Sequence, residues 1–207
     1  LASRLFNSLP PSAEPYVREI PGDIARADRH VQRDIGQTHI VLGARSFAYT
    51  HPRQYDLMVA NTALGGGMTS RLFQQVRENL GLAYAVYSYL EAMEDTGLFS
   101  TYVACDGKRM DRALDVLKAE LGVFGREGIT DEELRCSKAQ LRGELILGFE
   151  SVDRRMSRIA REEIYTGRYH RPDELLSAID RVTRDGVLEV SADLLAEDRL
   201  HQVTVGP

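Results

Sequence analysis

The sequence predicts an α+β fold in which a mostly antiparallel sheet packs on several helices. Two observations support this prediction. The strand patterns at 84–91 and 97–105 are joined by a loop longer than a tight two-residue turn, as in a loosely connected hairpin, and the helical patterns come in clusters. A doubly wound parallel sheet would instead need strands and helices to alternate along the chain. The pattern therefore indicates a two-layer α/β sandwich.

Composition limits the classes of partner. The chain has 207 residues, 43% of them hydrophobic, and a net charge of −5, all ordinary for a soluble globular protein. No basic block stands out, so no nucleic-acid partner is expected. No apolar run approaches the roughly 18 residues of a membrane span. Cys105 and Cys136 lack metal-ligand spacing, so both are expected to be buried thiols of a protein in a reducing, cytoplasmic compartment.

The chain begins with a segment typical of a linker. Residues 1–23 contain "LPPSAEP" and "EIPGD", and prolines so close together favour extended backbone. One domain is expected at 24–207. Its first two strands are predicted within 25–35 and 37–47, the second because its side chains alternate in hydrophobicity.

Two helices separated by glycines are predicted next. The first begins at Pro52, and the glycines at 65–67 end it. The second is capped by Thr69 or Ser70 and ends at Gly81. Its expected inward-facing side chains are Leu72, Phe73, Val76 and Leu80.

Cap residues mark the helices after the hairpin. Asp106, Thr130 and Ser151 are expected to begin three successive helices, and Glu133 completes a capping box with Thr130. The helix after Ser151 ends at Gly167. Its apolar residues are Met156, Ile159, Ala160 and Ile164. Two short helices at 173–181 and 184–196 and a strand within 199–206 complete the predicted domain.

The glycines at 65–67 are the first candidate for chemistry, because glycines at a helix start can cradle a phosphate. A Walker-type loop, however, needs a lysine after its glycines, and a dinucleotide-binding loop needs a strand before them. The sequence has neither feature here. The glycines are therefore interpreted as a turn between two helices.

Common metal-binding and catalytic patterns are also missing from the sequence. Its five histidines have no chelating spacing such as H-x-x-E-H, and the nucleophile motif G-x-S-x-G does not occur. Glu162 and Glu163, beside Arg158 and Arg161, are interpreted as a solvated helix face with i,i+4 ion pairs. The chain alone therefore offers no complete catalytic centre.

Arg77 and Tyr84 are the candidate site residues. In a structural interpretation, Arg77 complements the helix dipole and Tyr84 packs within its strand. Alternatively, a turn at Gly81 brings the end of the helix and the start of the strand together, so that the two side chains converge. Both can donate hydrogen bonds, and a tyrosine hydroxyl can stabilise a developing oxyanion.

The stretch "TALGGGMTSRLFQQVRENLGLAYAVYS" resembles the C-terminal-domain signature of the pitrilysin/insulinase-type zinc metallopeptidases, a group that includes mitochondrial processing peptidase. The similarity continues through 128–168 and 179–207. Its most specific part is an arginine and a tyrosine separated by six residues. The resemblance implies a LuxS/processing-peptidase-like metallohydrolase domain.

The resemblance also implies roles for the pair. Tyr84 would stabilise the tetrahedral intermediate of peptide hydrolysis, and Arg77 would orient a peptide carbonyl. In such enzymes a separate N-terminal domain holds zinc through H-x-x-E-H and a downstream glutamate, and this chain lacks that motif. We therefore expect the substrate-binding half of a zinc metalloendopeptidase, inactive by itself and without metal or cofactor. Leu1 as the first residue fits a fragment whose catalytic half lies upstream.

Other assemblies fit the same residues. The alternative function is a non-catalytic partner or structural subunit of a heterodimeric processing-peptidase-like assembly. The expected partners are a peptide substrate, the protein's own N-terminal catalytic domain or a partner subunit, and a second copy of the chain in a homodimer.

Overall fold

The computed structural model describes Ser8, Gly22 and residues 25–207, so most of the linker predicted at 1–23 lies outside the described residues. One sheet has the strand order β1-β5-β2-β4-β3. β1 and β5 run parallel and the other three pairs are antiparallel, which makes the sheet mixed rather than purely antiparallel. The strands are Asp28–Gln32 (β1), Thr38–Ser46 (β2), Ala83–Ala92 (β3), Gly97–Cys105 (β4) and His201–Gly206 (β5).

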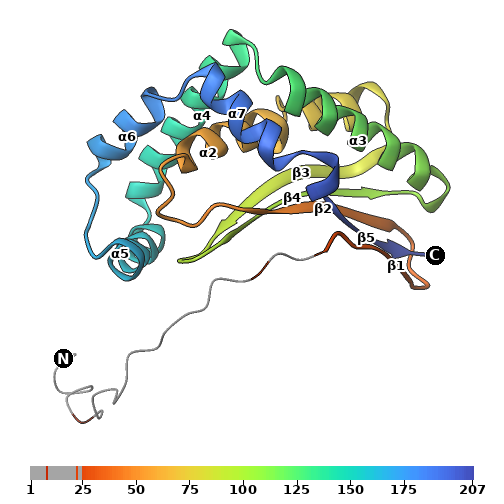
Figure 1. Cartoon of the computed structure of the whole chain (residues 1–207), viewed down its shortest axis with the longest axis horizontal. Helices are drawn as coiled ribbons and strands as arrows, with labels where there is room; N and C mark the ends of the chain where they lie inside the picture. The colour runs from red at the N-terminus through yellow and green to blue at the C-terminus, as the bar shows by residue number, and fades with distance from the viewer. Residues whose placement is uncertain (1–7, 9–21, 23–24) are drawn as a thin grey trace.

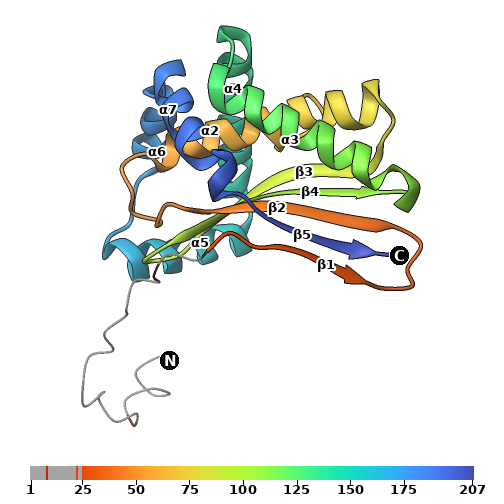
Figure 2. The same cartoon turned by 45° about the vertical axis from the view of Figure 1, so that its right-hand side comes forward.

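Most helices form a second layer on one face of this sheet (Figures 1 and 2). The α-helices are Gln54–Gly65 (α2), Met110–Glu127 (α3), Asp131–Glu150 (α4), Val152–Thr166 (α5), Pro172–Asp180 (α6) and Arg184–Leu194 (α7). Three short helices are Phe73–Asn79 (η1), Gly107–Arg109 (η2) and Glu197–Arg199 (η3). α5 lies apart from the others, near the sheet end where β3 stops. The predicted two-layer α+β fold is confirmed.

Alternation along the strands places the core between the two layers. In β2, Thr38, Ile40 and Leu42 are at most 1% exposed, whereas their neighbours His39 and Val41 are partly exposed. The buried strand residues meet fully buried side chains of the helix layer, among them Val59, Leu117, Leu121, Phe124 and Val187. Full burial of each large apolar side chain contributes about 1.5–3 kcal/mol. None of the helices in the described part of the chain is long and apolar enough to cross a membrane.

The predicted cap residues begin their helices as expected. Thr130 Oγ1 accepts a hydrogen bond from the Glu133 amide at 3.2 Å, and Glu133 Oε2 accepts one from the Thr130 amide at 2.7 Å. Asp106 and Ser151 accept bonds from amides two and three residues further on. Gly167, at φ +67°, ends α5. These predictions are confirmed. Such caps can be predicted from sequence because each depends on hydrogen bonds between residues a few positions apart.

Two helix predictions are wrong in detail. α2 begins at Gln54 and not at Pro52, because the amide of Arg53 bonds to His51 Nδ1 at 3.2 Å in a turn before the helix. The helix after the glycines is a π-helix over Phe73–Asn79. Its amide bonds reach one residue further back than in an α-helix, as in the 3.2 Å bond from the amide of Leu80 to Gln75 O.

Two side-chain predictions are also wrong. Cys105 is buried as predicted, but Cys136 is exposed on the outer side of α4, where its thiol donates to Glu132 Oε1 at 3.3 Å. Glu162 is 1% exposed and does not belong to a solvated face. Its carboxylate accepts bonds from Arg158 Nη1 at 3.0 Å and from the His170 amide at 2.8 Å. Burial is tolerated because the charge is paired and hydrogen-bonded.

Candidate functional site

Arg77 is carried by η1, which buried neighbours hold in place. Leu72 and Val76, on the inner side of this segment, are fully buried. The Arg77 side chain is 45% exposed, and its Nε lies 3.9 Å from Glu78 Oε1. Its guanidinium carbon lies 4.9 Å from the centroid of the Phe73 ring, within cation–π distance. The arginine is therefore oriented by stacking while much of its surface stays accessible.

The turn at Gly81 joins η1 to β3. Gly81 has a φ of +57°, a conformation that favours glycine. In the common left-handed helix cap, the last amides bond to carbonyls five and three residues back. Here the amide of Leu82 reaches six residues back to Val76 O at 2.9 Å, and that of Gly81 four residues back to Arg77 O at 3.2 Å. The cap is one residue wider than usual, as the π-helix requires.

Tyr84 lies at an irregularity near the start of β3. Ala83 pairs with Cys105 and Ala85 with Ala104, so Tyr84 is an extra residue with no partner opposite it on β4. This is a β-bulge, which bends a strand and changes the direction of a side chain. Tyr84 is 59% exposed, unlike a tyrosine packed within a sheet. The purely packed interpretation of Tyr84 is therefore wrong.

The structure places Arg77 and Tyr84 at one corner, on either side of the Gly81 turn. The Leu82–Val76 bond holds the start of β3 against the end of η1, and Arg109 Nη1 donates to Gly81 O at 2.7 Å from the start of α3. Neither candidate side chain bonds to the other among the hydrogen bonds of the described residues. Both donors are thus available to a third molecule.

Sequence reasoning missed an aromatic group on the sheet face opposite the helices. Tyr87 pairs with Tyr102 across β3 and β4, and their rings stack with centroids 4.9 Å apart. Tyr102 Oη lies 2.6 Å from His39 Nδ1 on β2. Burial raises the pKa of Tyr102, and the neighbouring Tyr87 raises it further. The period-two spacing of Tyr87 and Tyr89 was the signal that could have found this group.

A hollow of about 800 Å³ lies on the same open face. Its floor includes Gly43 of β2 and Ser100 of β4, and Arg45, Tyr89 and His201 stand around it. A Cβ at Gly43 would lie 2.7 Å from Ser100 Oγ, so this close approach requires a glycine. The open face thus continues from the Tyr84 end of the sheet into a depression lined by short and aromatic side chains.

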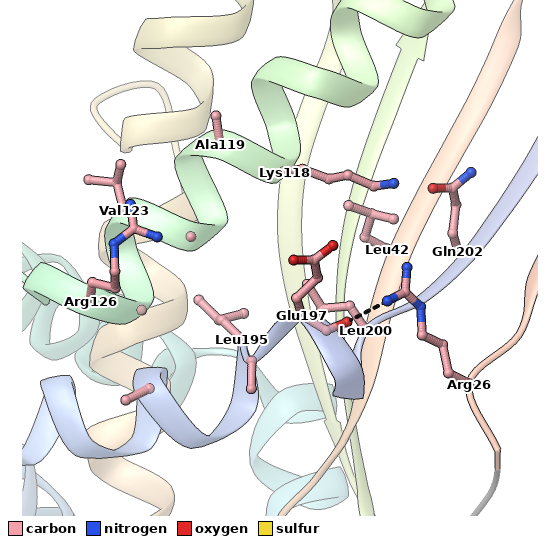
Figure 3. Close-up of a pocket in the computed structure, with 14 residues that line it drawn as sticks. Arg26, Leu42, Lys118, Ala119, Val123, Arg126, Leu195, Glu197, Leu200 and Gln202 are labelled. Carbon is pink, nitrogen blue, oxygen red and sulfur yellow. Dashed lines mark hydrogen bonds between the residues drawn. The ribbon is translucent and has the colours of Figure 1, made fainter.

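A second hollow, of about 570 Å³, lies on the helix side and is separate from the candidate pair (Figure 3). It opens between α3 and the connection from α7 to β5. Arg26, Lys118 and Arg126 contribute cations to its wall and Glu197 an anion, and Arg26 Nη1 donates to the Glu197 carbonyl at 3.1 Å. Neither Arg77 nor Tyr84 lines this hollow.

The described residues do not fit a metal. No group of three or more His, Cys, Asp or Glu side chains within them is placed to hold an ion. The side chains at the candidate corner, a guanidinium and a phenol, are hydrogen-bond donors and not metal ligands at neutral pH. The chemistry that this corner can supply is therefore the binding of carbonyl oxygens or of a developing negative charge.

Sequence comparison identifies the family. The profile of the family described as Peptidase M16 inactive domain matches residues 1–141, about two thirds of the chain. The chain belongs to this family. As an M16 inactive domain, it is the C-terminal half of a peptidase-family protein.

Curated relatives of this M16 domain carry the name of zinc protease. An uncharacterized zinc protease of Streptomyces coelicolor is 38% identical over 200 residues, which are 95% of this chain and 43% of the relative. The uncharacterized zinc protease YmxG of Bacillus subtilis is 37% identical over 167 residues, 81% of this chain and 41% of the relative. The chain therefore spans less than half the length of these relatives.

Solved structures share the fold of this M16 domain. A peptidase M16 inactive domain from Pseudomonas fluorescens has a TM-score of 0.85 at 22% identity, over 94% of this chain and 47% of that one. A protease from Helicobacter pylori has a TM-score of 0.86 at 18% identity, over 99% of this chain and 51% of that one. At such low identities the likeness concerns the fold alone.

Proposed function

We propose that this M16 domain forms the substrate-binding, non-zinc wall of a zinc-dependent metalloendopeptidase site. One observation carries the proposal: the corner between η1 and β3 presents Arg77 and Tyr84 outward, on a scaffold distorted at both ends. π-Helical segments and β-bulges both recur at functional sites. At this corner they flank the same short connection, Leu80–Leu82.

Each member of the pair has a distinct role in the proposed site. Arg77 binds and orients a carbonyl oxygen of an extended peptide through its guanidinium N–H groups. The Tyr84 hydroxyl donates to the oxygen of the scissile carbonyl as negative charge develops on it. Such donors are effective when they are fixed beforehand and water is excluded. Stacking on Phe73 restrains Arg77, the bulge sets the position of the Tyr84 backbone, and in this proposal a facing half would exclude water.

The zinc belongs, in this proposal, to the other half of the longer protein or to a partner subunit. The described residues supply no ligand set for it, and the relatives are more than twice as long as the region matched. Zinc would supply Lewis-acid activation of the substrate and of water. The partners are then a peptide substrate and the zinc-binding half.

Replacing Tyr84 by phenylalanine in the longer parent protein tests the proposal. Loss of one oxyanion donor should lower turnover about 10²–10³-fold, with zinc content unchanged. Tyr169→Phe is the matched control: it removes a tyrosine hydroxyl in the loop after α5, which accepts a 2.7 Å bond from Arg158 Nη2. Full activity of the Tyr84→Phe enzyme would refute the assigned role.

The same preparations distinguish a single-chain enzyme from the alternative, a partner subunit of a heterodimer. A parent that lacks zinc and gains peptidase activity only when mixed with the protein encoded beside it is a partner subunit. A parent that binds zinc and cleaves peptides alone is the single-chain enzyme.

A further inference from the structure

α5 contacts the rest of the domain through a few polar and aromatic side chains, and its other residues are exposed. Glu162 is buried there and accepts bonds from Arg158 on the same helix and from the His170 amide on the loop that follows. Arg158 Nη1 also donates to His170 O at 3.2 Å. One turn further, the Tyr165 ring lies 5.2 Å from that of Tyr49, on the connection after β2. Charged and aromatic groups, not aliphatic ones, thus attach this helix.

The aliphatic side chains of α5 lie on the solvent side. Val152, Met156, Ala160 and Ile164 follow one another at intervals of four residues, with Ile159 beside them, so they share one side of the helix. Two residues near the end of α4 are similarly exposed. The large apolar side chains of this surface are between 42% and 83% exposed, and we call them the outer strip: Ile146, Leu147, Val152, Met156, Ile159 and Ile164.

An ordinary surface helix buries its apolar side, whereas the apolar side of α5 is exposed. Contiguous apolar side chains exposed in this way mark an interaction surface. We propose that the outer strip packs against the other half of the longer protein, which would place a cation opposite Glu163. The inference rests on the proposed function for the existence of that half.

A second copy of the chain fits the outer strip poorly. Glu163 is exposed four residues after Ile159, so it lies within the strip and not at its edge. Antiparallel pairing of two α5 helices about the middle of the strip would bring Glu163 of one copy near Val152 of the other. Parallel pairing would bring the two Glu163 carboxylates together. Either arrangement desolvates a carboxylate without a partner, which is costly.

The size of the outer strip favours a tethered partner. It has six large side chains, whereas a standard interface between separate proteins takes about 20–30 residues from each side. Contacts between domains of one chain can be smaller, because the linker keeps the local concentration high. The matched region is 43% and 41% of two zinc-protease relatives, which leaves them room for a half of similar size in the same chain.

The test measures association of the halves and not peptidase activity. The 207-residue chain and the separately produced other half are mixed without zinc, and their Kd is determined by calorimetry. Met156→Glu and Ile159→Glu should each weaken binding at least about 10-fold, because they place a carboxylate in an apolar contact. Met68→Glu is the matched control: Met68 is also an exposed methionine, 73% against 61% for Met156, and lies in the loop before η1. Its substitution should leave the Kd unchanged.

Hydrogen exchange provides a second measurement. Amides of 146–164 should exchange more slowly in the longer protein than in the isolated chain, and circular dichroism should show that each variant is folded. Equal affinity of the Met156→Glu chain, or equal exchange of this segment in both proteins, would overturn the proposal. So would a dimer of the isolated chain that Met156→Glu dissociates. Halves that associate through the strip but cleave no peptide would refute the proposed function and leave this inference standing.

Discussion

Arg71 fixes the helix that carries Arg77, and its removal should loosen the candidate corner. Arg71 precedes η1, and its guanidinium forms a forked pair with the Glu133 carboxylate, including a 2.7 Å bond from Nη2 to Oε2. Nη2 also donates to Gly128 O at 2.8 Å. The guanidinium carbon lies 5.0 Å from the centroid of the Phe124 ring. One side chain thus ties the start of η1 to the connection between α3 and α4.

The expected cost of Arg71→Met follows from these contacts. Hydrogen bonds to charged groups contribute about 1.5–3 kcal/mol each when buried. The Arg71 and Glu133 side chains are 21% and 27% exposed, so solvent screens part of the pair. We expect the free energy of unfolding to fall by about 2 kcal/mol. For a domain of this size the corresponding fall in Tm is about 4–8 °C.

The pH dependence of this loss has a definite sign. Burial alone would raise the pKa of Glu133, but the bonds from Arg71 and from the Thr130 amide outweigh it and lower the pKa below its ordinary 4.5. A carboxyl group with a lowered pKa in the folded state stabilises the fold above its unfolded pKa, and the stabilisation is lost as pH falls through the folded pKa. The difference between wild type and Arg71→Met should therefore shrink as the pH falls below about 4.5.

A double-mutant cycle isolates the pair. Glu133→Gln removes the charge but keeps an oxygen that can accept from the Thr130 amide, so the cap survives. Urea unfolding of wild type, both single variants and the double variant at pH 7 should give a coupling energy of at least about 1 kcal/mol. Coupling that is no larger than the usual error of about 0.5 kcal/mol, or that persists unchanged at acidic pH, would show that this reasoning is wrong.

Three further predictions concern the cap, the buried pair and the thiols. Gly81→Ala should lower the free energy of unfolding in urea by about 1 kcal/mol because φ is +57°, although no atom lies within 4 Å of the added methyl group. Gly81→Asn should lower it less. Equal stability of the wild type and both variants would contradict the assigned strain. Glu162→Gln should lower the free energy of unfolding by about 3 kcal/mol because it leaves the mostly buried Arg158 charge unpaired, and the Arg158→Met/Glu162→Leu double variant should be less damaged. In the native protein a thiol reagent should modify Cys136 alone. The reaction should become faster as pH rises because the thiolate is the reactive form, and the hydrogen bond to Glu132, which raises the pKa of Cys136, moves this increase to higher pH. Modification of Cys105 before unfolding would contradict its burial.

Local sequence signals predicted the regular elements because those signals act over a few residues. The alternation around Ile40 placed β2, and the Thr130 capping box placed α4. Two features of the candidate corner, the π-helix and the bulge at Tyr84, were not predicted. Each inserts one residue into a regular element, and the choice between regular and widened pairing is made by neighbours distant in sequence, such as Cys105 and Ala104 opposite the bulge.

The sequence pattern also could not predict that the charged side chains of Arg158 and Glu162 are largely buried. The spacing of Arg158 and Glu162 predicted their ion pair correctly, but an i,i+4 pair looks the same on a solvated face and on a buried one. The deciding contact is the His170 amide, supplied by a loop whose path no periodicity describes.

The candidate corner combines exposed functional groups with buried support, and this combination is what hydrogen-bond catalysis needs. Arg77 and Tyr84 are exposed, while their neighbours Val76 and Leu82 are buried and joined by a backbone bond. Arg71 holds the corner from one side and Arg109 from the other, through carbonyl and carboxylate acceptors. A donor stabilises a transition state only to the extent that it is fixed before the charge appears. In the proposed metalloendopeptidase, loss of either anchoring arginine should reduce turnover more than it weakens peptide binding, since misplaced donors affect the transition state first.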